Sequence, residues 1–249
     1  MDELIPRVLS FLTPVELLFV PSVCRSWHHH AVTARATMIK KLHMGQFWSR
    51  IGVLPDERFT HLASGYTLVT ELNLAYCSSL TGPTLNALLH ALPAMARLSK
   101  LNLFYCFQLT DADIELVFGG SPCPLPAIRE LNLGRCSKLT ERSVRLLGAS
   151  LASLQILSLA HLACVGEETL MMFDDVRHFP SLTLLNVLHC PKWQGDHVEE
   201  LLRGAAQPNG RNALLAKQGR PPFKVIGPLE TFQVDKSGKK MRKDVDADT

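Results

Sequence analysis

Seven cysteines and ten histidines are the side chains of this chain most suited to act as nucleophiles or metal ligands. Four of the cysteines, Cys77, Cys106, Cys136 and Cys190, recur at one position of an internal repeat. No C-x-x-C pair occurs, so a zinc site has little support. A thiol repeated in successive units is typical of a small buried hydrophobe rather than of a disulfide framework. Cys190 follows His189 and could form a thiolate pair with it, but a buried position in the repeat explains this cysteine more simply.

Three consecutive histidines, His28, His29 and His30, would bind a metal ion if their rings converged. Consecutive residues on a helix point about 100° apart, so we expect a solvent-exposed helix face instead. No G-x-S-x-G, H-E-x-x-H, paired carboxylates or phosphate-binding loop is present in the sequence. The sequence therefore predicts a protein that is not an enzyme and that uses no cofactor or metal.

One phrase, L-x-x-L-x-L-x-x-C, occurs five times with small variations between Val69 and Cys190. Its central leucines are separated by 29, 30, 26 and 28 residues. These periods lie at or near the range of about 20–29 residues of leucine-rich repeats, in which each unit is a strand followed by a helix. We therefore expect an α/β fold, a leucine-rich-repeat solenoid of about five units with parallel strands on its concave face. The central leucines are Leu72, Leu101, Leu131, Leu157 and Leu185.

Each unit of the repeat has the same expected course. Leu72 and Leu74 alternate on a strand and point into the core, while Asn73 faces outward. The cysteine turns the chain, and a Leu-Thr step follows whose threonine is placed to cap the returning helix. In the fourth unit Leu162 replaces the cysteine, which predicts a reshaped turn. Ordering the backbone of one unit costs about 1–2 kcal/mol per residue, more than burial of its few leucines returns, so stability must come from stacking.

The segments before the repeats differ in character. Residues 1–44 are expected to be helical, with a capping box at Thr13-Pro14-Val15-Glu16 and a third helix over Ala31 to Leu42. Residues 45–67 form a connector without a clear pattern. The solenoid itself is expected over residues 68–203.

Residues 204–249 lose the period and are expected to form a mostly irregular basic tail. They contain nine Lys/Arg and five Asp/Glu, a balance of about +4, whereas the whole chain carries +3. The folded body is therefore near neutral, which argues against nucleic-acid binding. The segment KVIGPLETFQV could add a short strand that covers the last repeat. Lys236 to Lys243 could be a nuclear-import or anionic-surface patch, although a solvated chain end is the stronger interpretation.

The targeting signals bear on the compartment. We expect no signal peptide and no membrane span, because no charged-then-apolar leader and no apolar run near 18 residues occurs. An odd number of cysteines without a disulfide pattern fits a reducing compartment, cytoplasmic or nuclear.

Side chains that point outward from the strands and turns form the expected partner surface. The asparagine row, Asn73, Asn102, Asn132 and Asn186, is expected to be scaffold, with amides bonded to one another along the sheet. Aromatic and basic residues are the better candidates for binding, because Tyr, Trp, Phe and Arg supply most interface energy. An open alternative is that Tyr76 and Tyr105 only cover the neighbouring turns. The predicted partner-binding residues are Tyr76, Phe104, Tyr105, Arg135, His161 and His189.

The N-terminal stretch LIPRVLSFLTPVELLFVPSVCRSWHHHA resembles an F-box, and its Val-Cys-Arg-x-Trp end is the most specific part. Together with the cysteine-containing repeats, the chain resembles F-box proteins of the leucine-rich-repeat class over residues 1–44 and 68–203. The resemblance implies a substrate receptor of an SCF-type, cullin–RING ubiquitin ligase that docks on a Skp-type adaptor. It implies an adaptor contact through Leu12, Pro14, Leu17, Val23 and Trp27.

A second interpretation keeps the fold and changes the role. In this alternative a degenerate F-box merely covers the end of the solenoid, and the protein is a non-catalytic structural subunit of a large assembly. The Leu-Pro that usually opens an F-box would fall at or before Met1, and Pro21 removes a backbone donor within the second helix.

Overall fold

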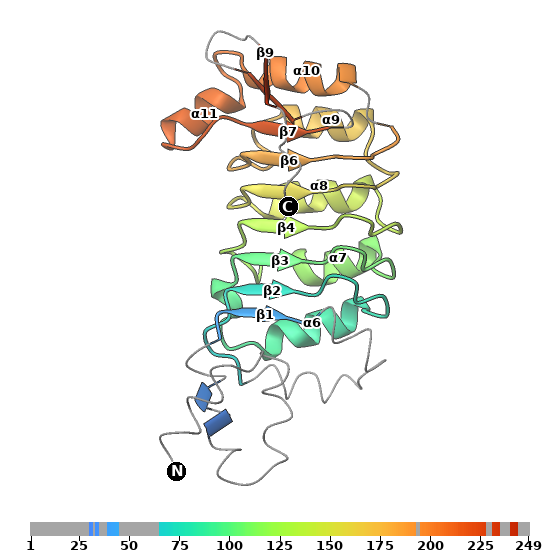
Figure 1. Ribbon diagram of the computed structural model, residues 1–249, viewed down its shortest axis with the longest axis vertical. Helices are drawn as coiled ribbons and strands as arrows, with labels where there is room; N and C mark the ends of the chain where they lie inside the picture. Colours follow the sequence, from blue (N-terminus) through green and yellow to red (C-terminus); the bar gives the residue numbers. More distant parts are fainter. Residues whose placement is uncertain are drawn as a thin grey trace.

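The computed structural model describes residues 30–31, 33–34, 39–44, 65–192, 195–227, 231–234 and 240–243. In this part of the chain, nine strands form one sheet in sequence order, stacked like the rungs of a ladder (Figure 1). Strands β1 to β7 are parallel, and β8 and β9 close the sheet as antiparallel strands. The strands are β1 (Lys41–His43), β2 (Glu71–Asn73), β3 (Lys100–Asn102), β4 (Glu130–Asn132), β5 (Ile156–Ser158), β6 (Leu184–Asn186), β7 (Lys224–Ile226), β8 (Thr231–Val234) and β9 (Lys240–Lys243).

A helix follows each of the strands β2 to β6 and returns the chain on one face of the sheet (Figure 1). The predicted α/β solenoid of parallel strands and returning helices is therefore present. Among the described residues, no helix has the length and apolarity that crossing a bilayer requires. The helices are α6 (Gly82–Ala91), the 3-10 turn η2 (Met95–Arg97), α7 (Asp111–Phe118), α8 (Glu141–Ser150), α9 (Glu167–Asp174), α10 (Gly195–Ala205) and α11 (Arg211–Lys217).

The central leucines of the phrase stand side by side in one register. Leu72 pairs with Leu101, and the same register continues to both ends of the parallel sheet. Every member of this row is at most 1% exposed, so each strand buries its side chain against the strand before it and the strand after it. The row consists of Leu42, Leu72, Leu101, Leu131, Leu157, Leu185 and Val225.

The repeated cysteines are buried thiols, as expected, and they link successive units. The Sγ of Cys106 donates to the carbonyl oxygen of Leu74 at 3.3 Å, and that of Cys136 donates to the carbonyl oxygen of Leu103 at 3.2 Å. Cys190 makes the same bond two units further on. Burial raises the pKa of Cys136 to about 12, so this thiol stays protonated and remains a donor at neutral pH.

The asparagine row is scaffold, but not through the predicted contacts between amides. Asn73 Oδ1 accepts a hydrogen bond from the backbone N–H of Ala75 at 2.9 Å, within its own turn. Asn102, Asn132 and Asn186 each accept the equivalent bond at 3.0 Å. Each amide therefore fixes the bend at the end of its strand, which is the usual use of asparagine in turns.

The predicted threonine cap is present at α7 and α8 and also ties helices together, whereas Thr81 makes no side-chain cap hydrogen bond at α6. Thr110 and Asp113 form a capping box at the start of α7. Thr140, which precedes α8, donates its hydroxyl to Asp111 of the previous helix at 2.5 Å, and Ser143 donates to the same carboxylate. Burial acts to raise the pKa of Asp111, but the hydrogen bonds from Ser143 and Thr140 outweigh it and hold that pKa below its ordinary value.

The prediction of a helix from Ala31 to Leu42 is wrong at its end. Residues 30–31 and 33–34 are helical, but Lys41–His43 forms β1, parallel to β2. Leu42 and Met44 are both buried, which places them where Leu72 and Leu74 stand in the next unit. Two alternating apolar residues are too short a pattern to separate a strand from the end of a helix.

The prediction of a mostly irregular tail over residues 204–249 is also wrong in the part of this segment that the structure describes. This segment contains α11, β7, β8 and β9, and the suggested added strand in KVIGPLETFQV is confirmed as β7 paired with β6. Phe223 and Val225 are buried there. A Cβ on Gly227 would lie 2.9 Å from Val198 Cγ2, so a helix side chain fills the space that a second strand leucine fills in the other units.

The fourth turn keeps its first bend and changes beyond it, since Val165 makes no bond to Leu162 like that of Leu139 to Cys136. Leu162 is 1% exposed and occupies the place of the cysteine. Its N–H donates to the carbonyl of Leu159 at 3.2 Å, and the equivalent bond from Cys136 to Leu133 is also 3.2 Å. This backbone hydrogen bond does not involve the side chain, so exchanging the thiol for an isobutyl group leaves it intact.

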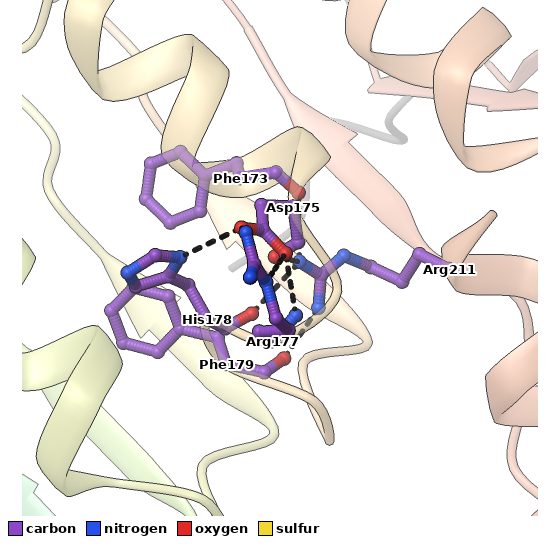
Figure 2. Close-up of polar contacts among 6 residues, drawn as sticks. All are labelled: Phe173, Asp175, Arg177, His178, Phe179 and Arg211. Atoms are coloured by element: carbon purple, nitrogen blue, oxygen red, sulfur yellow. Dashed lines mark hydrogen bonds and ion pairs between the residues drawn. The ribbon is translucent and has the colours of Figure 1, made fainter.

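A buried arginine that the sequence did not reveal holds the C-terminal end together. Figure 2 shows Arg211, at the start of α11, pointing at the turn that follows α9. Its guanidinium donates to the carbonyl oxygen of Phe173 at 2.7 Å, to that of His178 at 3.1 Å and to that of Phe179. Arg211 is 1% exposed, and burial lowers its pKa to about 10, so it stays charged at neutral pH.

The neighbouring Arg177 gives a direct comparison between a buried and an exposed arginine. Its Nε donates to Oδ1 of Asp175 at 3.0 Å and its Nη2 donates to Oδ2 at 2.7 Å (Figure 2). The hydrogen bonds from Arg177 lower the pKa of Asp175 to about 2. The Arg177 side chain is 87% exposed, so water can replace this pair at little cost.

We predict that Arg211→Met lowers the free energy of unfolding by about 3 kcal/mol, because buried carbonyl groups lose their hydrogen-bond donor. Arg177→Met is the matched control and should leave the free energy of unfolding nearly unchanged. Urea unfolding followed by circular dichroism measures both. Equal midpoints for the two variants would contradict the assigned role of Arg211.

Candidate functional site

Five of the six predicted partner-binding residues occupy the same place in successive turns. Each stands three residues after the end-of-strand asparagine or serine, and each has a positive φ between 58° and 66°. We call these residues the turn row. It consists of Tyr76, Tyr105, Arg135, His161 and His189.

The backbone of the turn row carries a cost. Residues other than glycine seldom adopt this left-handed conformation, and asparagine or aspartate would adopt it more readily than tyrosine, arginine or histidine. A strained position that is occupied by a large side chain in every one of these turns points to a use for that side chain. Tyr76 is 55% exposed and Tyr105 is 37% exposed. Burial of the two rings therefore does not explain why tyrosine occupies these unfavourable backbone positions.

The first three members of the turn row gather with two phenylalanines into one cluster. Tyr76 lies 5.6 Å from Tyr105 and 5.5 Å from Phe104 between ring centroids. The guanidinium carbon of Arg135 lies 5.9 Å from the centre of the Phe104 ring and 6.0 Å from that of Tyr105, at the outer limit of a cation–π contact. We call this set, with Phe107, the aromatic–arginine cluster.

Phe107 was missed at the sequence level. Its ring lies 5.7 Å from that of Tyr105, edge to face. Phe107 follows the cysteine of its unit, one place beyond the positions that the repeat pattern marks as outward-facing. The equivalent residues, Ser78, Ser137 and Ala163, are small, and a single large residue at an otherwise small position was the available signal.

Gly134 creates the space in which the Phe104 ring lies. A Cβ on Gly134 would lie 2.9 Å from Phe104 Cδ2 and 3.2 Å from the carbonyl oxygen of Ala160. One edge of the Phe104 ring thus packs against the backbone of the next unit at Gly134, and the ring contacts Arg135 and Tyr76. Gly134 therefore contributes to the site because it has no side chain that would displace the Phe104 ring.

The last two members of the turn row form a separate pair. The rings of His161 and His189 are stacked with their centroids 4.5 Å apart. Burial, followed by the positive charges of Arg135 and His189, lowers the pKa of His161 below its ordinary value. No group of three potential metal ligands exists among the described residues, so the structure offers this pair no third ligand there.

At the end of the strands away from the turn row, the exposed face of the sheet carries an alternating series of charges, which we call the charged row. Lys41 and Glu71 form an ion pair at 3.1 Å, and Lys100 and Glu130 form one at 2.8 Å. A groove crosses this face from β1 to β5. Its lining includes Glu71, Lys100 and Glu130 of the charged row, three members of the asparagine row, and apolar Ile156 at the next strand, so the groove changes from neutralised charge to hydrocarbon along its length.

The structure thus joins Tyr76, Phe104, Tyr105 and Arg135 and sets His161 beside His189 as a second group. The predicted adaptor contact cannot be placed in the same way. Its residues lie outside the described part of the chain: Leu12, Pro14, Leu17, Val23 and Trp27. His28 and His29 lie outside it as well.

We predict that Arg135→Gln raises the pKa of His161 toward its ordinary value, because removal of a neighbouring positive charge makes protonation of the imidazole less unfavourable. Arg142→Gln is the control, since Arg142 pairs with Glu115 on the helix side at 2.6 Å. Titration of the histidine Cε1–H signals by NMR gives both midpoints. An unmoved His161 midpoint in Arg135→Gln would show that the two side chains do not interact.

Comparisons with known proteins add little to the geometry. No protein-family model and no curated protein matches the chain. Among solved structures, the crystal structure of the yeast Rad7 and Elc1 complex contains a similar chain, with 20% sequence identity and a TM-score of 0.45. The match covers 58% of this chain and 35% of the yeast chain, so this protein corresponds to about a third of the length of the yeast chain. The function therefore has to be argued from the surface of the chain itself.

Proposed function

We propose that this protein is the substrate-recognition adaptor of an SCF-type, cullin–RING ubiquitin ligase. In this proposal the segment before β1 binds a Skp-type adaptor, and the exposed face of the repeats binds the protein to be ubiquitinated. The resemblance of residues 1–44 to an F-box supports the first half. The second half rests on one observation, the exposed aromatic–arginine cluster held at strained turn positions.

The proposed mechanism requires no catalytic group in this chain. A partner bound beside a ubiquitin carrier reacts faster because tethering raises its effective concentration. The rigid stack of strands would fix the distance between adaptor and partner. Such a role needs a stable surface with a few strong anchors, which exposed tyrosine and arginine residues provide.

A structural role in a larger assembly is the second candidate. The paired charges of the charged row favour it, because a surface whose charges are already neutralised can be covered permanently without leaving an ion unpaired. In that case the F-box-like segment would only cover the end of the repeats.

Co-purification separates the two candidates. We expect the tagged full-length protein to recover a Skp-type adaptor and a cullin in equal amounts, and Leu17→Asp or Trp27→Ala to reduce this recovery at least about tenfold, as loss of a central interface anchor does. Leu116→Asp is the matched control, since Leu116 is 50% exposed on α7. Permanent partners without adaptor or cullin would instead support the scaffold.

Partner capture tests the repeat surface independently. We predict that Tyr105→Ala combined with Arg135→Ala weakens capture about tenfold or more without lowering the melting temperature, because exposed anchors contribute to binding rather than to folding. Arg145→Ala combined with Met171→Ala, on exposed helix positions, is the control. The readout is the yield of ubiquitinated proteins recovered from proteasome-inhibited cells. An unchanged yield would remove this surface from consideration.

A further inference from the structure

The aromatic–arginine cluster carries a positive charge that no acidic side chain of the described chain neutralises. Arg135 is exposed and takes part in none of the ion pairs among the described residues. Its guanidinium lies over the rings of Phe104 and Tyr105. Lys138, three residues further on, donates to the neutral amide of Gln108 at 2.6 Å. The cluster therefore presents one cation, Arg135, that no described carboxylate neutralises, beside aromatic rings.

The carboxylates of the surrounding units are engaged elsewhere. Glu71 and Glu130 pair with lysines of the charged row, near the other end of the strands. Asp111 accepts hydrogen bonds from the start of α8, and Glu115 pairs with Arg142. On the other side of Arg135 stand the stacked rings of His161 and His189, which bring no negative charge.

The tyrosines next to Arg135 leave their polar ends available. No described residue forms a hydrogen bond with the hydroxyl of Tyr76 or of Tyr105. A carboxylate placed against Arg135 can accept two parallel hydrogen bonds from the guanidinium fork. A tyrosine hydroxyl can donate a further one, while the faces of Phe104 and Phe107 accept an apolar side chain from the same segment.

We propose that the aromatic–arginine cluster binds an acidic segment of the partner protein, in which an aspartate or glutamate stands next to an aromatic or aliphatic residue. The proposal rests on the proposed function and specifies the chemistry of its partner. The three turn-row residues of the cluster span two strand spacings, roughly 10 Å. An extended segment of about three residues covers that length.

A nucleic acid also combines negative charge with flat rings, but this surface suits it less. Binding a phosphate chain requires several unpaired cations along its path. Glu71 and Glu130 lie on the same exposed face of the sheet, and the whole chain carries a net charge of only +3. A short acidic peptide needs one good cation site, which Arg135 provides.

Selection from a random heptapeptide library on the immobilised full-length protein tests this inference. We expect the selected peptides to contain Asp or Glu adjacent to an aromatic or aliphatic residue. Against Arg135→Gln the affinity of a selected peptide should fall about tenfold, as loss of a charge-assisted bond does. Selection against Arg135→Glu should favour Lys or Arg at the same position. Arg145→Glu, on α8, is the control and should select the same peptides as the wild type.

Four results would overturn the inference. The first three are the absence of any selected peptide, selected peptides without an acidic residue, and an acidic preference that persists in Arg135→Glu. The fourth is complete displacement of a selected peptide by poly(U) at equal concentration, which would indicate a nucleic-acid surface. None of these outcomes involves the adaptor, so failure here is distinguishable from failure of adaptor recovery.

Discussion

Each repeat unit buries its core side chains against the neighbouring units, and the rest of the structure depends on these contacts between units. The central leucines are buried because a strand stands on each side of them. The cysteine thiols donate to carbonyl groups of an earlier unit, and Asp111 binds the start of the next helix. Such contacts force successive strands into one register, and a common register is what aligns the turn row on one surface.

The sequence predicted those parts of the fold in which one pattern recurs. Leucine alternation and buried cysteines were correct, and a threonine cap was correct at Thr140 but not at Thr81, because a pattern repeated five times is less affected by variation in one copy. The two ends were wrong because their units keep only fragments of the pattern, such as Leu42 with Met44 in β1 and Val225 with Gly227 after β7. At Gly227 the side chain of Val198, from a helix distant in the sequence, fills the core position. A pattern of adjacent residues cannot predict such a contact.

The sequence predicted which residues of the candidate site face outward, but not how their side chains are arranged. Tyr76, Tyr105 and Arg135 were identified because they follow the strand at a constant distance. Their common positive φ, the space at Gly134 and the inclusion of Phe107 depend on how adjacent turns face each other. Arg211 escaped notice for the same reason, since its partners are backbone carbonyls more than thirty residues away.

The thiols of the repeat have a consequence for the cell's redox chemistry. Peroxides and disulfides react with the thiolate form of cysteine, and burial raises the pKa of Cys77 and of Cys136 to about 12. Almost none of either residue is ionised near pH 7, and neither sulfur is open to solvent. We therefore expect oxidants to leave these two thiols unmodified. The partner surface that the repeats support should then keep its shape during exposure to oxidant.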